Sequence, residues 1–111
     1  MEINIRQETP ADYDAVYRLV KEAFATADHS DGDEQDLVVR LRKSEAFIPE
    51  LSLVAEADGV PAGYILLTKI RVGEETELAA APLAVAPAFQ RKGVGSALIR
   101  EAGRAARGLG Y

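Results

Sequence analysis

The protein has 111 residues, of which 13 are basic and 18 acidic, so its formal net charge is −5 at neutral pH. That length indicates one domain. The absence of cysteine excludes disulfides, thiolate metal sites and cysteine nucleophiles. Because His29 is the only histidine, we expect neither a multi-histidine metal site nor a Ser-His-Asp relay.

The sequence also bears on where the protein is found and what it binds. Its longest apolar stretch, Leu78 to Phe89, is too short to cross a bilayer, and the first residues lack the pattern of a secretory signal. We therefore expect a cytoplasmic protein that does not enter a membrane. Residues 1–60 carry a net charge of −8 and residues 61–111 one of +3. The basic half is too small and too poor in aromatic residues to predict nucleic-acid binding.

The first 43 residues predict a strand followed by two helices. Ile3–Arg6 alternates apolar and polar residues, as a short strand does. A helix is predicted from Thr9 and Pro10 onward, since apolar residues then recur with helical spacing: Val16, Leu19, Val20, Ala23 and Phe24. Residues 25–33 read as a loop. A second helix should run from Asp33 to Lys43, with acids in its first turn and bases in its last.

The remaining residues predict three antiparallel strands and a final helix. Leu51–Ala57 and Pro61–Leu67 flank Asp58-Gly59, a strong hairpin signal. After a turn at residues 72–75, Glu77–Val85 is apolar on both faces and is predicted to be a central strand. The final helix should span Gly93–Gly108.

The segment with the clearest chemical signal is residues 83–99, which combines a buried strand, a basic glycine loop and a helix start. The first N–H groups of a helix lack internal partners and sit at the positive end of its dipole. Gly93 and Gly95 would let an oxyanion approach that backbone, and Arg91 and Lys92 add positive charge. Neither a Walker loop nor a complete dinucleotide fingerprint is present.

This segment resembles the acetyl-CoA-binding motif of the GCN5-related N-acetyltransferases. The resemblance rests on Gln90-x-x-Gly93-x-Gly95, preceded by Leu83-Ala84-Val85-Ala86-Pro87, and the order of elements is similar as well. It implies an α/β (α+β), acyl-CoA N-acyltransferase-like fold, with a mostly antiparallel central sheet flanked by helices. It further implies acetyl-CoA as co-substrate, with no metal. The residues that would bind the coenzyme pyrophosphate through their backbone are Gln90, Arg91, Lys92, Gly93, Val94, Gly95 and Ser96. Leu83, Ala84 and Val85 would pair with the pantetheine arm.

The resemblance implies direct transfer of the acetyl group to a primary amine, small molecule or peptide, assisted by a general base. Some members carry a glutamate fourteen residues before the first loop glycine, but here that position is Ala79. Glu77, two residues earlier on the same strand face, and Glu56 are the candidates for the base. Glu34 and Asp36 could bind a cationic acceptor or serve only as helix-capping charges. A tyrosine often protonates the leaving thiolate in this family. The alternative is a non-catalytic acyl-CoA-binding or regulatory module, or an inactive fragment.

The resemblance also predicts that residues 1–111 are a single, truncated domain, whose C-terminal strands and helix are missing. Family members continue after the phosphate-binding helix with a strand beside the one that ends at Val85. Without that strand an apolar sheet edge would be left bare. A homodimer or a domain-swapped partner would be a way to cover it.

Overall fold

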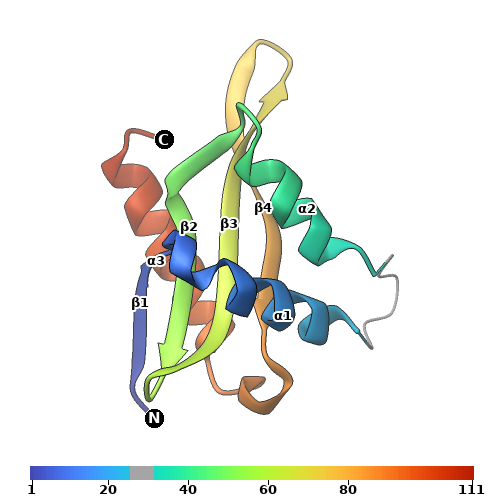
Figure 1. Ribbon diagram of the computed structural model, residues 1–111. Coiled ribbons are helices and arrows are strands. Elements are labelled where there is room, and N and C mark those ends of the chain that lie inside the picture. Colours follow the sequence, from blue (N-terminus) through green and yellow to red (C-terminus); the bar gives the residue numbers. More distant parts are fainter. Residues whose placement is uncertain (26–31) are drawn as a thin grey trace.

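The computed structural model describes residues 1–25 and 32–111. Within them four strands form one antiparallel sheet in the order β1-β2-β3-β4, with three α-helices packed on it (Figure 1). The strands are β1 (Ile3–Gln7), β2 (Phe47–Ala57), β3 (Val60–Val72) and β4 (Glu75–Val85), and the helices are α1 (Tyr13–Phe24), α2 (Glu34–Arg42) and α3 (Val94–Gly108). The predicted fold class is confirmed. His29 and most of the predicted loop at residues 25–33 lie outside the described residues.

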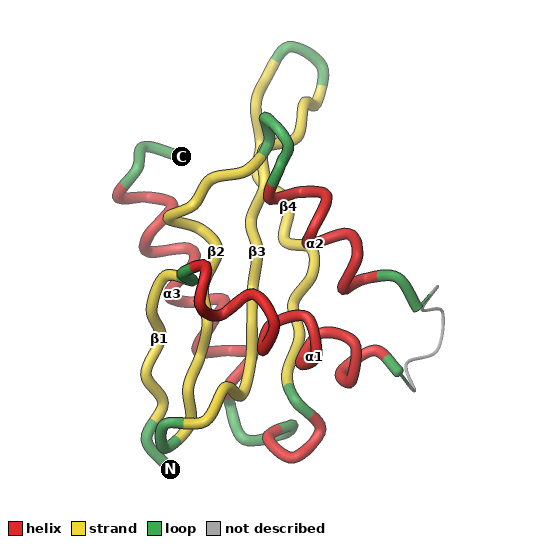
Figure 2. Tube along the Cα trace, viewed as in Figure 1, coloured by secondary structure: helices red, strands yellow, loops and turns green. Residues whose placement is uncertain are grey.

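The helices divide between the two faces of the sheet. Helices α1 and α2 cover one face and α3 covers the other, as Figure 2 shows. On the first face a core forms around residues from α1, α2 and three strands: Val16, Leu19, Val20, Val38, Val54, Tyr64, Leu66 and Ala84. On the second face α3 buries Val94, Leu98 and Ala102 against small and branched residues of β2 and β3. Residues of β2, β3 and β4 therefore contribute to both cores, whereas β1 contributes only to the core under α3.

The helical segment begins at Pro10 with Thr9 as its N-cap, as predicted, but its first turn is a 3-10 turn. Pro10–Asp12 forms a 3-10 turn, and the α-helix begins at Tyr13. The Asp12 carboxylate accepts the Thr9 backbone N–H at 2.8 Å, as in the acidic half of a capping box. It also receives two bonds from the Arg6 guanidinium, at 2.7 and 2.8 Å. Asp12 is thereby tied to β1 as well as to the turn, which fixes where α1 enters the sheet face.

The position of the strand around Leu83 also differs from the prediction. The sequence predicted a central strand, but in the described ranges, 1–25 and 32–111, β4 pairs only with β3 and forms the edge of the sheet. Ala84 lies in the core under α1, whereas Leu83 and Val85 pack on the α3 side. The apolar residues on both faces of β4 thus indicate that helices cover both faces. They do not indicate whether a strand lies on each side of β4. A further strand or partner chain along this edge stays a prediction.

The pairing of β3 with β4 is interrupted by a bulge. Ile65 pairs with Leu83 and Leu67 with Ala80, so two residues of β4, Ala81 and Pro82, stand opposite the single residue Leu66. The Ala81–Pro82 peptide bond is cis. Pro82 lacks an N–H group and cannot donate to a sheet ladder, so the regular C-terminal part of β4 is confined to the residues from Leu83 onward.

Candidate functional site

The end of β4 presents backbone hydrogen-bonding groups at an open edge. Ala86 N–H donates to Ala62 O at 2.8 Å. In an antiparallel pair the residues that bond to the partner alternate with residues that point away. Since Tyr64 pairs with Ala84, the N–H and C=O groups of Leu83 and Val85 point away from β3. The structure therefore brings two of the predicted pantetheine-binding residues to a sheet edge with outward amides, while the Ala84 side chain is buried under α1.

The Gln90 side chain bonds back to the end of β4 across the turn that follows the strand. A 3-10 turn, Pro87–Phe89, leads from the strand to Gln90. The Gln90 side-chain Nε2 donates to the outward carbonyl of Val85 at 3.1 Å. From the sequence, Gln90 was predicted to bind an anion through its backbone alone; this side-chain contact could not be predicted because it depends on how the turn folds back.

The loop before α3 has the backbone shape of an anion site. Arg91 and Gly93 have φ angles of 64° and 86°, in the left-handed region. The first hydrogen bond of α3 runs from Ala97 N–H to Gly93 O at 3.0 Å, so the N–H groups of Val94, Gly95 and Ser96 have no intrahelical acceptor. The side chains of Arg91 and Lys92 are exposed beside them. Free amides, a helix dipole and two cations together favour an oxyanion such as a pyrophosphate.

The structure requires glycine at two positions near this loop for different reasons, a positive φ angle at one and close packing at the other. Gly93 needs its positive φ, and a Cβ there would point into open space. A Cβ on Gly95 would make an ordinary contact, 3.6 Å from Val85 Cγ2. The tightest position is Gly63 on β3, where a Cβ would lie 2.9 Å from side-chain atoms of both Val94 and Leu98. Gly63, which the sequence analysis overlooked, therefore lets the start of α3 approach the sheet; a glycine inside a predicted strand was the available signal.

The two candidate bases lie away from the open edge. Glu56 is on β2, separated from β4 by β3, and its carboxylate accepts Arg6 Nε at 3.0 Å. Glu77 is exposed on β4 itself and has no ion-pair partner among the described residues. It lies six positions before Leu83 along the strand, which is about 20 Å of extended chain. The structure does not bring either carboxylate to Leu83 and Val85.

The other polar candidates have structural contacts of their own. Asp36 accepts the Tyr17 hydroxyl at 2.9 Å, and this bond raises the pKa of the Tyr17 phenol. Tyr64 is fully buried, its hydroxyl lies 2.6 Å from Ser52 Oγ, and burial raises the pKa of this phenol. Tyr111 is exposed and lies beside Glu77 in a depression next to α3. None of these hydroxyls is placed at the Leu83–Val85 edge.

The structure adds two observations on ligand classes. In residues 1–25 and 32–111, no three His, Cys, Asp or Glu side chains gather in a way that could hold a metal ion. Across the same residues, every helix is too short or too polar to cross a membrane.

Comparison with known proteins agrees with this geometry. The sequence model of the acetyltransferase (GNAT) family matches residues 13–111, which include the whole of the strand, loop and helix just described. The chain belongs to the GNAT acetyltransferase family. The predicted family membership is thereby confirmed.

Individual relatives within the GNAT family support the fold at high similarity. A GNAT acetyltransferase of Brucella melitensis, solved with acetyl-CoA, superposes with a TM-score of 0.89 at 33% identity, over 98% of this chain and 71% of that one. YhbS of Escherichia coli, solved with coenzyme A, gives a TM-score of 0.84 at 26% identity, over 100% of this chain and 59% of that one.

A relative of Escherichia coli, the uncharacterised N-acetyltransferase YjhQ, is 42% identical over 71 residues. Those residues are 60% of this chain and 39% of YjhQ. The chain thus spans well under half of this curated relative.

Proposed function

We propose that the protein transfers the acetyl group of acetyl-CoA to a primary amine by direct attack of the amine on the thioester. The observation that carries the proposal is a pair of main-chain donor groups on one connection: the outward amides of Leu83 and Val85 on β4, and the amides of Val94, Gly95 and Ser96 at the start of α3, which have no intrahelical acceptor. The pantetheine arm would add to β4 as a short strand, with the pyrophosphate at Gly93–Ser96. An outward amide of β4 would polarise the thioester carbonyl.

We propose further that the acceptor amine loses its proton to water rather than directly to a carboxylate. Glu56 is engaged by Arg6, and Glu77 lies about 20 Å along the strand from Leu83. An alkyl ammonium ion has a pKa of about 10, so the neutral nucleophile becomes more abundant as the pH rises. The rate of transfer should then increase with pH up to that value. Glu56→Gln and Glu77→Gln should leave kcat within about twofold of wild type, because general-base catalysis contributes on the order of a hundredfold or more.

The test of the coenzyme site uses Gly95→Asp and measures acetyl-CoA binding by calorimetry. The new Cβ makes only an ordinary contact, and an acid in the first turn of α3 suits the helix dipole, so the variant should fold. Its charge repels a pyrophosphate, and we expect affinity to fall by about tenfold or more. Gly103→Ala, in the same helix but away from the loop, is the control and should bind as wild type does. Full binding by Gly95→Asp would refute the assigned site.

The alternative is a module that binds acyl-CoA without turnover, which the remote positions of Glu56 and Glu77 favour. Release of free coenzyme A thiol, measured against a panel of primary amines, separates the two functions. Thiol release that depends on the amine supports acetyl transfer. Binding of acetyl-CoA without amine-dependent release supports the module.

A further inference from the structure

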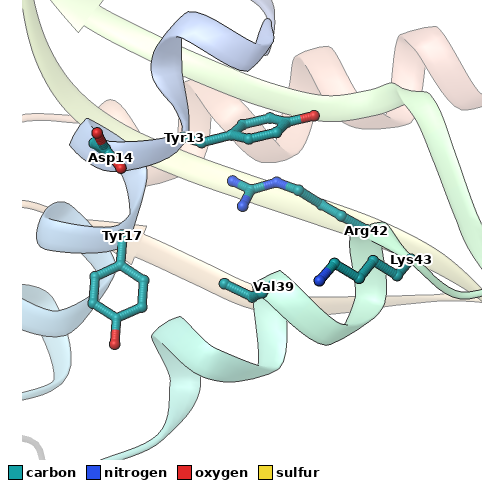
Figure 3. Close-up of a pocket in the computed structure, with 6 residues that line it drawn as sticks. All are labelled: Tyr13, Asp14, Tyr17, Val39, Arg42 and Lys43. Atoms are coloured by element: carbon teal, nitrogen blue, oxygen red, sulfur yellow. The ribbon is translucent and has the colours of Figure 1, made fainter.

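A pocket of about 310 Å³ lies between α1 and α2. Figure 3 shows the six side chains that line it: Tyr13, Asp14 and Tyr17 from α1, and Val39, Arg42 and Lys43 from α2 and its end. The volume is at the small end of the range for ligand sites, which suits a molecule of amino-acid size better than a nucleotide. None of these lining residues belongs to β4 or to the loop before α3.

The aromatic walls of the pocket are held in place by buried or partly buried contacts. The Tyr13 ring stacks on the Arg42 guanidinium, with 4.0 Å from Arg42 Cζ to the ring centroid. Arg42 forms two bonds to the carboxylate of Glu8, one of them from Nε to Oε1 at 3.1 Å. The Tyr17 hydroxyl is held by Asp36 at 2.9 Å. Both rings are therefore fixed to α2 before any ligand arrives, which lowers the entropic cost of binding.

The charges of the pocket define the ligand that would fit. The charge of Arg42 is already balanced by Glu8, whose side chain is only 2% exposed. Within the described part of the chain, neither Asp14 on one wall nor Lys43 on the other has an ion-pair partner. The pocket thus offers one free carboxylate and one free ammonium group, and Val39 and the tyrosine rings supply its apolar lining.

We propose that this pocket binds a small amphoteric molecule with an apolar side group, the chemistry of an apolar α-amino acid. The ammonium group of the ligand pairs with Asp14 and its carboxylate pairs with Lys43. The apolar group lies against Val39 and the ring faces. An acid or an amine alone satisfies only one of the two free charges and brings a like charge toward the other.

The pocket lies on the flank of α1 opposite the coenzyme loop. The other flank carries Ala15, Arg18 and Glu22, which line a separate depression with Pro61 and Ala86 at the end of β4. A molecule bound between α1 and α2 therefore lies on the other side of α1 from this depression and from the end of β4. It is a second ligand, not the acetyl acceptor, and the proposal stands independently of acetyl transfer.

The experiment measures binding of L-phenylalanine to the full chain by calorimetry. Two analogues serve as comparison: 3-phenylpropionate, which lacks the ammonium group, and phenethylamine, which lacks the carboxylate. We expect saturable binding of L-phenylalanine and about tenfold weaker binding of each analogue, since each loses one charge-assisted contact. Absence of saturable L-phenylalanine binding at millimolar concentration, or equal affinity for all three compounds, would overturn the proposal.

Two variants then test which ligand group pairs with Lys43 and which pairs with Asp14. Lys43→Met should weaken the binding of L-phenylalanine about tenfold but should not weaken that of phenethylamine, which loses only a like charge. Asp14→Asn should likewise weaken L-phenylalanine about tenfold and should not weaken 3-phenylpropionate. Both side chains are exposed, so neither variant should unfold the chain. Lys69→Met, an exposed lysine on β3, is the matched control and should bind as wild type does. If it weakens binding as much as Lys43→Met, the pocket is not the site.

Discussion

The two faces of the sheet are built on different principles. The face under α3 is packed from apolar and small residues, with Ala55, Ala57, Ala62 and Gly63 bringing the helix close. The face under α1 and α2 buries a polar chain that runs from Tyr64 through Ser52 and Glu8 to Arg42. The face under α3 is thus shaped by small and apolar side chains that let the helix approach, whereas the face under α1 and α2 is held by hydrogen-bonded and charged side chains.

The largest expected effect comes from breaking the polar chain at Glu8. Glu8→Gln leaves the Arg42 guanidinium, whose side chain is only 9% exposed, without its anion. Removing one partner of a buried pair costs about 3–5 kcal/mol of the free energy of unfolding. Urea denaturation measures this loss. The double variant Glu8→Leu with Arg42→Met should recover most of it, and a single variant as stable as wild type would show that this face does not depend on its charges.

A smaller effect is expected on the opposite face, at Gly63. Gly63→Ala places a methyl group 2.9 Å from Leu98 Cδ1 and Val94 Cγ1 and 3.1 Å from Ala84 O. Overpacking of this kind costs about 1–3 kcal/mol. Because the start of α3 must move, acetyl-CoA affinity should fall together with thermal stability.

Gly103→Ala on the outer part of α3 is the control for that prediction. Its new Cβ meets only the flexible end of Arg107, at 3.5 Å. Alanine is favoured over glycine inside a helix by about 0.5–1 kcal/mol, so this variant should gain stability and keep its acetyl-CoA affinity. Equal behaviour of the two variants would show that Gly63 is not a close-packing position.

The smallest effect concerns pH. The Arg6 guanidinium holds the pKa of Asp12 well below its ordinary value. A carboxylate with a depressed pKa in the folded state stabilises the protein above its unfolded pKa of about 3.9 and loses that contribution as the pH falls further. Asp12→Asn should therefore be less stable than wild type at neutral pH, and the gap should narrow in acid. Thermal melts recorded from neutral pH down to below about pH 3.9 measure this difference in stability. The control is Asp14→Asn, because Asp14 has no ion pair in the described residues. It should melt at the same temperature as wild type at each pH.

The order and type of the elements could be predicted from the sequence because periodicity, capping and turn residues are local signals. The same is true of the strand, glycine loop and helix from Leu83 to Ile99. The apolar pattern of β4 alone could not show its edge position, since this pattern is the same whether helices or strands cover the strand; only the family resemblance predicted a bare edge there. The bond between Glu8 and Arg42 could not be predicted either, because it joins residues 34 positions apart. The roles of Gly63 and of the Gln90 side chain likewise follow only from the packed chain.

The contact between Gln90 and the Val85 carbonyl has a consequence for self-association. A strand that docked along β4 to build a longer sheet would need an uninterrupted row of donors and acceptors. At one end Gln90 already occupies the Val85 acceptor, and at the other the bulge at Ala81 and Pro82 interrupts the regular alternation of outward groups. Only a few main-chain groups around Leu83 remain between these two stops. The open edge can therefore pair with a short extended segment that carries only one or two amide groups. It is a poor template for the amyloid-like stacking of whole chains.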